Sequence, residues 1–293
     1  MTPDAVLTAF FVIVTGVIGL LIGSFLNVVV YRVPQGVSIV SPPSACPHCS
    51  ARIRSRDNVP VFSWLVLRAR CRDCSAPISA RYPIVELLTG VCFALAALAF
   101  VPRVPGDAMS AAYFAGAHSA GTQFAGVLEL IAVLYLVAIS IALTLIDLDT
   151  HRLPNAIVIP SYLVGGAIYV AAAVVGSNYD SLCRAAIGMA ALFLLYAVMA
   201  FAYPGGMGLG DVKLAGVLGL YLGWSGWGSL AVGALAAFIL GGLFGLILII
   251  IRKANARSGI PFGPWMIAGA WIGIVFGGAM FTGYLSLFGL AVA

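Results

Sequence analysis

Long apolar runs, separated by short polar segments, make up most of this chain. Each run is about twenty residues long, the length of helix that crosses about 30 Å of hydrocarbon. We therefore expect an all-α polytopic membrane protein with about eight transmembrane helices. The predicted spans are 7–30, 83–100, 126–146, 156–175, 185–203, 212–224, 229–251 and 261–284.

The sixth run, 212–224, is short for a full crossing. It begins inside the preceding glycine-rich stretch, or tilts, or lies in a thinned part of the bilayer. That stretch reads Gly-Gly-Met-Gly-Leu-Gly-Asp-Val-Lys from Gly205 to Lys213 and places Asp211 beside the apolar run. A carboxylate at the edge of the hydrocarbon is costly unless it is paired, hydrated or protonated. Asp211 is therefore a candidate functional residue.

Composition excludes a soluble globular protein. Hydrophobic residues make up 62% of the chain and charged residues 9%, with a mean hydropathy of +1.09, whereas about a quarter of a soluble domain is charged. The N-terminus carries Asp4 in place of a basic region, and its apolar run continues for a full span. These two features argue against a cleavable signal peptide, so we expect the first helix to remain.

The positive charge is concentrated in one loop. Eight of the fifteen basic residues, all arginines, lie from Arg32 to Arg81, with only Asp57 and Asp73 against them. The positive-inside rule makes this loop cytoplasmic, and orientation alone explains the arginines, so no nucleic-acid partner is expected. With an external N-terminus, the predicted cytoplasmic segments are 31–82, 147–155, 204–211 and 252–260, and the loop 101–125 is external.

Two Cys-x2-Cys pairs lie in the arginine-rich loop and are separated by twenty-one residues. Each pair offers two thiolates to one tetrahedral ion, so the pattern resembles a zinc ribbon. Disulfides are the alternative, and a reducing cytoplasmic loop disfavours them. Four thiolates leave no open coordination position, which predicts a structural zinc that stabilises a loop without an apolar core. The predicted ligands are Cys46, Cys49, Cys71 and Cys74.

A second acid, Asp147, directly follows the third apolar run and lies at the same predicted membrane face as Asp211. Two carboxylates that share a proton suggest aspartyl hydrolysis: the ionised acid activates water and the protonated acid polarises the scissile carbonyl. Proton relays and cation sites of transporters also use paired acids. Asp149, two residues on, fits a solvated helix cap better, but it stays an alternative for the first acid.

Two motifs resemble those of a known family. Gly208-Leu209-Gly210-Asp211 has the form Gly-x-Gly-Asp, and the segment from Asp147 to Pro154 has the form Asp-x6-Pro. Both look like the catalytic motifs of the type IV prepilin leader peptidases. The chain differs from this family pattern at two positions. It has Asn155 where many members have Asp, and Leu209 where many have an aromatic residue. Further segments that resemble the family are 23–34, the tetracysteine loop, 78–90 and 260–264.

This resemblance implies a multi-pass protein of the bacterial inner membrane that removes the basic leader of prepilins or pseudopilins. It implies that Asp147 and Asp211 are the catalytic pair and that the four loop cysteines bind zinc. The chain then divides into the first transmembrane helix (1–30), a cytoplasmic zinc-binding loop (31–82) and a transmembrane peptidase core (83–293). The sequence leaves the oligomeric state undetermined.

Long members of that family also methylate the new N-terminal residue with S-adenosylmethionine, and this activity is implied here too. No glycine fingerprint of a soluble nucleotide-binding fold supports it. The candidate residues are Asn27, Arg81 and Glu86, which the sequence places at the cytoplasmic membrane edge. Glu86 could accept the substrate's free amine or pair with Arg81.

Three other functions are consistent with part of the sequence. The chain could be a peptidase without methyltransferase activity. A proton-coupled transporter would use the paired acids, but it would leave the tetracysteine loop unexplained. A membrane-anchored zinc module that binds a partner would need the loop and not the acids.

Overall fold

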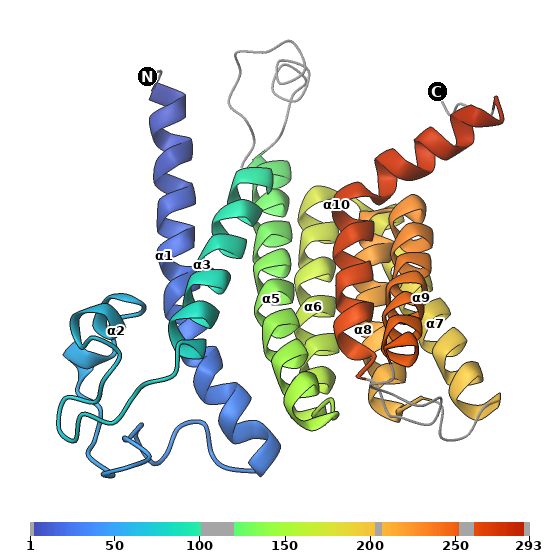
Figure 1. Cartoon of the computed structure of the whole chain (residues 1–293). Helices are drawn as coiled ribbons and strands as arrows, with labels where there is room; N and C mark the ends of the chain where they lie inside the picture. The colour runs from blue at the N-terminus through green and yellow to red at the C-terminus, as the bar shows by residue number, and fades with distance from the viewer. Residues whose placement is uncertain (1–2, 101–119, 203–206, 252–260, 290–293) are drawn as a thin grey trace. The chain divides into compact units, whose positions relative to one another are not determined.

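The computed structural model describes residues 3–100, 120–202, 207–251 and 261–289. Within these ranges the chain is helical apart from the cysteine loop and short connections (Figure 1), which confirms the predicted all-α class. The predicted external loop 101–125, the residues Gly205 and Gly206, and the predicted cytoplasmic loop 252–260 lie largely or wholly outside the described residues. The helices are α1 (Pro3–Arg32), η1 (Val33–Gln35), η2 (Ser55–Asp57), α2 (Phe62–Val66), α3 (Arg81–Phe100), α5 (Ala120–Thr150), α6 (Asn155–Gly176), α7 (Tyr179–Ala202), α8 (Leu209–Ser225), α9 (Trp227–Ile250) and α10 (Gly263–Leu287).

Seven of the described helices are long and apolar enough to cross a membrane: α1, α3, α5, α6, α7, α9 and α10. The remaining predicted span corresponds to α8, which has 17 residues. Its residues from Leu214 to Trp224 are all buried inside the protein. Because neighbouring helices cover α8, its apolar character serves protein packing, and the run 212–224 belongs to the interior of a helix bundle.

The chain forms two compact units, Met1–Ala142 and Leu143–Ala293, and the boundary between them lies within α5. In the first unit α1 and α3 pack side by side and antiparallel (Figure 1). Small residues bring the two backbones together, since a Cβ added to Gly23 would lie 2.6 Å from the Cα of Glu86. Close approach through small residues is the usual way in which helices associate in lipid.

The cysteine loop of the first unit contains two short turns of the same geometry. An isolated β-bridge joins Ala45 to Arg52 around the first Cys-x2-Cys pair, and another joins Arg70 to Pro77 around the second. Ser50 and Ser75, which directly follow the two pairs, both have a positive φ, of 57° and 59°. The sequence Cys-x2-Cys-Ser-Ala therefore occurs twice and folds twice into the same knuckle.

Glycines also determine the packing of the second unit. A Cβ on Gly188 of α7 would lie 2.5 Å from the carbonyl oxygen of Gly219 of α8, and a Cβ on Gly219 would meet the carbonyl of Gly188. In the same way a Cβ on Gly269 of α10 would lie 2.5 Å from the backbone nitrogen of Ala237 of α9. These contacts hold α8 between α7 and the α9–α10 pair, so that its N-terminus, with Asp211, has a fixed place.

Candidate active site

Asp147 lies near the C-terminal end of α5 and is only 4% exposed. Its Oδ2 accepts a hydrogen bond of 3.1 Å from the backbone N–H of Gly263, the first residue of α10. The first N–H groups of a helix have no partner within that helix, and its N-terminus favours negative charge. Asp147 thus caps a helix that begins 116 residues later in the chain.

Asp211 lies in the first turn of α8 and is half-buried. Its Oδ2 accepts a hydrogen bond of 3.2 Å from the backbone N–H of Gly208, the residue that caps the helix. This is the reach-back bond of a capping box, in which an acid at the third helical position satisfies the cap residue's N–H. Asp211, like Asp147, is therefore held through one carboxyl oxygen at a helix N-terminus.

The structure brings these two acids together. Asp147 binds the N-terminus of α10 and Asp211 lies in the first turn of α8, and the same residue, Leu153, lies against both of these helix starts. Leu153 packs between their helices, because a Cβ added to Gly210 would lie 3.0 Å from the Cβ of Leu153, and one added to Gly263 would lie 3.4 Å from its Cδ2. The segment that follows Asp147 thereby contacts the starts of both α8 and α10.

Asp149 and His151 lie on either side of the end of α5. The side chain of Asp149 is exposed, whereas that of Asp147 is buried, as expected for residues two apart on a helix. His151 follows α5 with φ 52°, and its backbone N–H donates a hydrogen bond of 2.8 Å to the carbonyl oxygen of Asp147. The predicted third span ended before Asp147; the helix instead continues to Thr150 and fixes the direction of the Asp147 side chain.

Tyr196 and Phe262 adjoin the acids and were not among the sequence-predicted site residues. The ring of Phe262 lies 5.9 Å from that of Phe238 and 6.3 Å from that of Tyr196, measured between centroids. Tyr196 is 2% exposed, and the charge on Asp211 acts on it. A phenol in the middle of an apolar span, and a glycine between two prolines at Pro261–Pro264, are the sequence signals that point to them.

Lys213 lies two residues beyond Asp211, in the second turn of α8. Its Nζ donates a hydrogen bond of 3.0 Å to Oδ1 of Asn155, at the start of α6. The hydroxyl of Tyr162, also on α6, donates to the carbonyl oxygen of Lys213. The lysine thus connects α6 with α8. The oxygen that accepts its hydrogen bond belongs to Asn155, one of the positions at which this chain differs from the family pattern.

The four predicted metal ligands converge in the cysteine loop. The Sγ atoms of Cys46, Cys49, Cys71 and Cys74 all lie within 4.8 Å of one another. A tetrahedral ion with metal–sulfur bonds of about 2.3 Å separates its ligands by about 3.8 Å, and the sulfurs of Cys46 and Cys74 are 3.8 Å apart. Backbone N–H groups of Cys49 and His48 lower the pKa of Cys46 to about 6, which favours the ligating thiolate. The donor set and its spacing therefore fit a metal ion.

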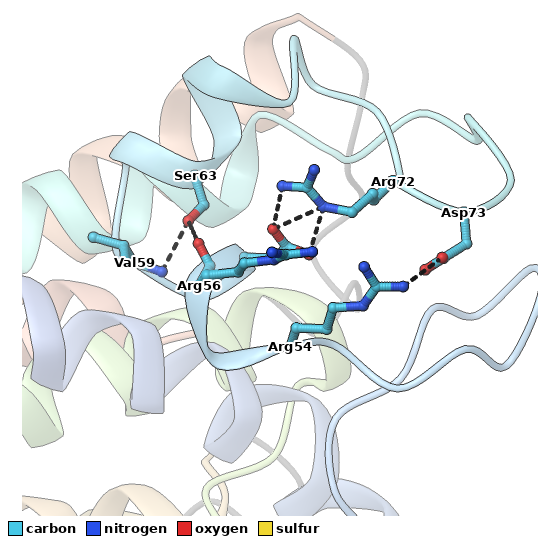
Figure 2. A network of polar contacts seen from close by, with 7 residues as sticks. Arg54, Arg56, Val59, Ser63, Arg72 and Asp73 are labelled. Carbon is cyan, nitrogen blue, oxygen red and sulfur yellow. Dashed lines mark hydrogen bonds and ion pairs between the residues drawn. The ribbon is translucent and has the colours of Figure 1, made fainter.

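Ion pairs connect the second knuckle with the segment between the two knuckles (Figure 2). Arg72 donates from Nε and Nη2 to the carboxylate of Asp57, with the shortest of these bonds at 2.5 Å, and Arg54 pairs with Asp73 at 3.1 Å. The side chain of Asp57 is 8% exposed and that of Asp73 is 39% exposed. The hydrogen bonds from Arg72 hold the pKa of Asp57 below its usual range.

Two of the three candidate residues for methyl transfer lie where α1 and α3 meet. Asn27 donates a hydrogen bond of 3.2 Å to the carbonyl oxygen of Tyr82, and Glu86 packs against Gly23. Glu86 is 8% exposed, and its Oε2 accepts a hydrogen bond of 2.7 Å from the N–H of Val61 in the cysteine loop. Arg81, exposed at the first position of α3, is next to Tyr82. Glu86 thus already connects the loop to the membrane helices.

Two family models match this chain. The family model described as "Type IV leader peptidase family" matches residues 134–250, which include both acids. The model described as "Bacterial Peptidase A24 N-terminal domain" matches residues 17–100, which include the four cysteines.

The chain belongs to the type IV leader peptidase family. It is 35% identical over 294 residues to the prepilin leader peptidase/N-methyltransferase of Aeromonas hydrophila, covering 92% of each chain. It is 31% identical to the protein of the same name from Stutzerimonas stutzeri, covering 97% of this chain and 98% of that one. The protein of that name from Pseudomonas aeruginosa is 32% identical, with 95% of each chain covered.

These similarities run the length of the chain and confirm the family resemblance seen in the sequence motifs. No solved structure matches this chain. The geometry described above therefore gives the family's motifs their structural context: Gly-x-Gly-Asp is a helix start with a reach-back bond, and Asp-x6-Pro is a helix end followed by a turn that contacts α8 and α10.

Proposed function

We propose that this protein cleaves the leader peptide from type IV prepilins or pseudopilins, with Asp147 and Asp211 as the catalytic pair. The observation that supports the proposal is that both carboxyls are held by backbone N–H groups at helix N-termini, and that Leu153 lies against both of these helix starts. Burying carboxyls beside apolar helices is energetically costly, so two such acids from distant parts of the chain indicate a functional role.

In this mechanism the two acids share one proton. The hydrogen bonds from Gly208 and Gly263 occupy Oδ2 of Asp211 and of Asp147, and the proposal assigns the two Oδ1 atoms to water and substrate. The ionised acid takes a proton from water, whose oxygen attacks the scissile carbonyl. The protonated acid donates its proton to the carbonyl oxygen. Collapse of the tetrahedral intermediate breaks the C–N bond as the first acid gives its proton to the leaving nitrogen, and one hydroxyl of the intermediate returns a proton to the second acid as the C=O bond re-forms.

We propose zinc as the ion of the cysteine loop. Four thiolates at tetrahedral spacing are a typical structural zinc set, and the fit to 3.8 Å between Cys46 and Cys74 supports this choice over harder cations. With four protein ligands the ion would stabilise the loop and take no part in bond cleavage. The knuckles, which place backbone N–H groups toward Cys46, would hold the thiolates whether or not substrate is bound.

We further propose that the protein methylates the new N-terminal residue, the second activity named in its relatives. S-adenosylmethionine would supply the methyl group. Asn27, Arg81 and Glu86 are the candidate residues at the cytoplasmic end of α1 and α3. Oε2 of Glu86 is engaged by Val61, so its Oε1 would be the oxygen that holds the substrate amine.

Orientation and domain division follow from this proposal. We place the arginine-rich loop and both acids at the cytoplasmic face of the inner membrane, where the positive-inside rule puts such a loop. We retain the division into a first helix (1–30), a zinc loop (31–82) and a membrane peptidase core (83–293) as a functional one. The core would cleave, and the loop with the helices beside it would serve methyl transfer.

Mass spectrometry of the pilin N-terminus tests both activities at once. The full chain, reconstituted in liposomes with a prepilin and S-adenosylmethionine, should produce a pilin without its leader and with one added methyl group. Cleaved but unmethylated pilin would leave a peptidase alone. Intact prepilin together with ion flux in the same liposomes would favour the transporter and contradict the proposal.

A further inference from the structure

The short helix α2, in the cysteine loop, has one outward apolar face. Phe62, Leu65 and Val66 are 64%, 59% and 58% exposed, and their spacing puts them on the same side of one helical turn. The intervening residues face inward: Ser63 is buried and donates to the carbonyl of Arg56, and Trp64 donates through Nε1 to the carbonyl of Ile78. The exposed face is therefore set by the loop's own hydrogen bonds.

A hydrogen bond to a membrane helix fixes the depth of α2. Val61, the residue before α2, donates its N–H to Oε2 of Glu86 at 2.7 Å. Glu86 lies five residues, or about 7.5 Å along the helix axis, after the start of Arg81–Ala99, a segment long and apolar enough to cross a membrane. Helices that lie in the plane of the bilayer bury their apolar face by about 5–10 Å. The hydrogen bond therefore holds the start of α2 beside the first turns of an apolar helix, a position compatible with the membrane interface.

The backbone at Val61 shows that this placement is built into the loop. Val61 has φ 60° and ψ −49°, and the N–H of Phe62 donates to the carbonyl of Pro60. This is close to a classic γ-turn, which is rare and strained for a β-branched residue. The side chain of Glu86 accepts the N–H of Val61 in this turn, and the turn leads directly into α2.

The surroundings of α2 have the polarity of a membrane surface. In the turns of α3 next to Glu86, Ile84, Leu87 and Leu88 are 60%, 53% and 49% exposed and present an apolar surface. On the other side, Arg68 and Arg70 are exposed and line a surface hollow together with Val66 and Leu67. Arginines beside an exposed apolar face match the phosphates and acyl chains of an anionic bilayer.

The acids of the cysteine loop form their ion pairs with arginines other than Arg68 and Arg70. Its two acids, Asp57 and Asp73, already pair with Arg72 and Arg54. An anionic leaflet attracts each arginine near its surface, and the attraction falls off within a Debye length. The binding should therefore weaken in high salt.

We propose that Phe62, Leu65, Val66, Arg68 and Arg70 form a docking patch that binds the anionic bilayer surface. The apolar residues enter the interface and the two arginines bind lipid phosphates. The cysteine loop then lies against the membrane beside α1 and α3, instead of extending into the cytoplasm. This surface is independent of the peptidase proposal, because it uses neither Asp147 nor Asp211.

Hydrogen exchange of the full chain in nanodiscs tests the docking patch. Amides of residues 62–70 should exchange on the order of tenfold more slowly in nanodiscs of phosphatidylglycerol and phosphatidylcholine than in phosphatidylcholine alone. Salt should remove the difference. Arg68→Gln with Arg70→Gln should abolish it as well, whereas the control Arg52→Gln, an exposed arginine of the first knuckle, should keep it. Metal content of each variant checks that the loop is folded.

A photoreactive phospholipid with its probe in the acyl chain provides the second measurement. It should label peptides that contain Phe62 and Leu65, and Leu65→Asp should reduce the labelling. Equal exchange in both lipid mixtures without labelling would overturn the proposal. Slower exchange at these residues only after addition of purified prepilin would also overturn it, and would make the patch a protein-binding surface.

Discussion

The backbone N–H of Gly263 donates a hydrogen bond to Oδ2 of Asp147 at 3.1 Å, and this bond links the end of α5 to the start of α10. The relationship leaves no room for a side chain at residue 263, since a Cβ there would lie 2.7 Å from the same Oδ2. The proposed catalytic acid Asp147 can therefore occupy this position only because residue 263 is a glycine.

Gly263→Ala should therefore lower the rate of prepilin cleavage by about a hundredfold, the scale of loss expected when a catalytic group moves by about 1 Å. Gly278→Ala is the matched control, because it lies on the same helix and its Cβ would meet nothing within 4 Å. The measurement is the initial cleavage rate in liposomes. Equal rates for the two variants would show that the contact at Gly263 does not position Asp147.

Replacing one zinc ligand should empty the metal site. Cys46→Ser or Cys71→Ser should lose most of the bound zinc, destabilise the loop and lower activity indirectly, because three thiolates no longer complete the tetrahedron. Elemental analysis of the purified protein gives the metal content. Cys183→Ser, at an isolated exposed cysteine, should keep the full amount. Full metal content in either ligand variant would refute the four-cysteine site.

The two ion pairs of the loop should differ in importance. The pKa of Asp57 is lowered in the folded loop, so the stability it contributes is fully present above the ordinary carboxyl value of about 3.9 and is lost as the pH falls through the folded value. At neutral pH, Asp57→Asn should therefore make trypsin cut the loop several-fold faster. Asp73→Asn, at the exposed pair with Arg54, should have little effect. The reverse order would contradict this assignment.

Packing of α7 against α8 should be sensitive to one methyl group. Gly219→Ala would place its Cβ against the carbonyl of Gly188 and should lower the free energy of unfolding by about 1–3 kcal/mol. Gly242→Ala, where a Cβ meets nothing within 4 Å, should not. Thermal unfolding in detergent measures the difference, and equal midpoints would count against close backbone packing.

Run length and charge were enough to predict the helical membrane fold, because each span must be apolar over a fixed length. Helix ends were harder. The third span was predicted to end at about residue 146, and the helix continues to Thr150, since a helix does not end where the hydrocarbon does. The burial of α8 depends on glycines of α7, α9 and α10, and such contacts between distant segments leave no pattern in a single run.

The candidate site was predictable where spacing carries chemistry. Two Cys-x2-Cys pairs stand out by their spacing, and Asp147 and Asp211 stand out because each adjoins a long uncharged run. Gly263, Leu153 and Tyr196 were missed, as they act through shape: a space for a carboxylate, a contact between two helix starts and a buried ring. The hydrogen bond from Val61 to Glu86 could not be predicted from the sequence either, because the backbone turn that orients this N–H has no fixed sequence signature.

The central claim is that Asp147 and Asp211 cleave the prepilin leader together. The most direct test measures the N-terminal mass of pilin after reaction with Asp147→Asn, Asp211→Asn and Asp149→Asn, each in liposomes and each with its zinc content checked. We expect intact prepilin from the first two variants and cleaved pilin from Asp149→Asn. Cleavage by either of the first two, or its loss only in Asp149→Asn, would contradict the assignment.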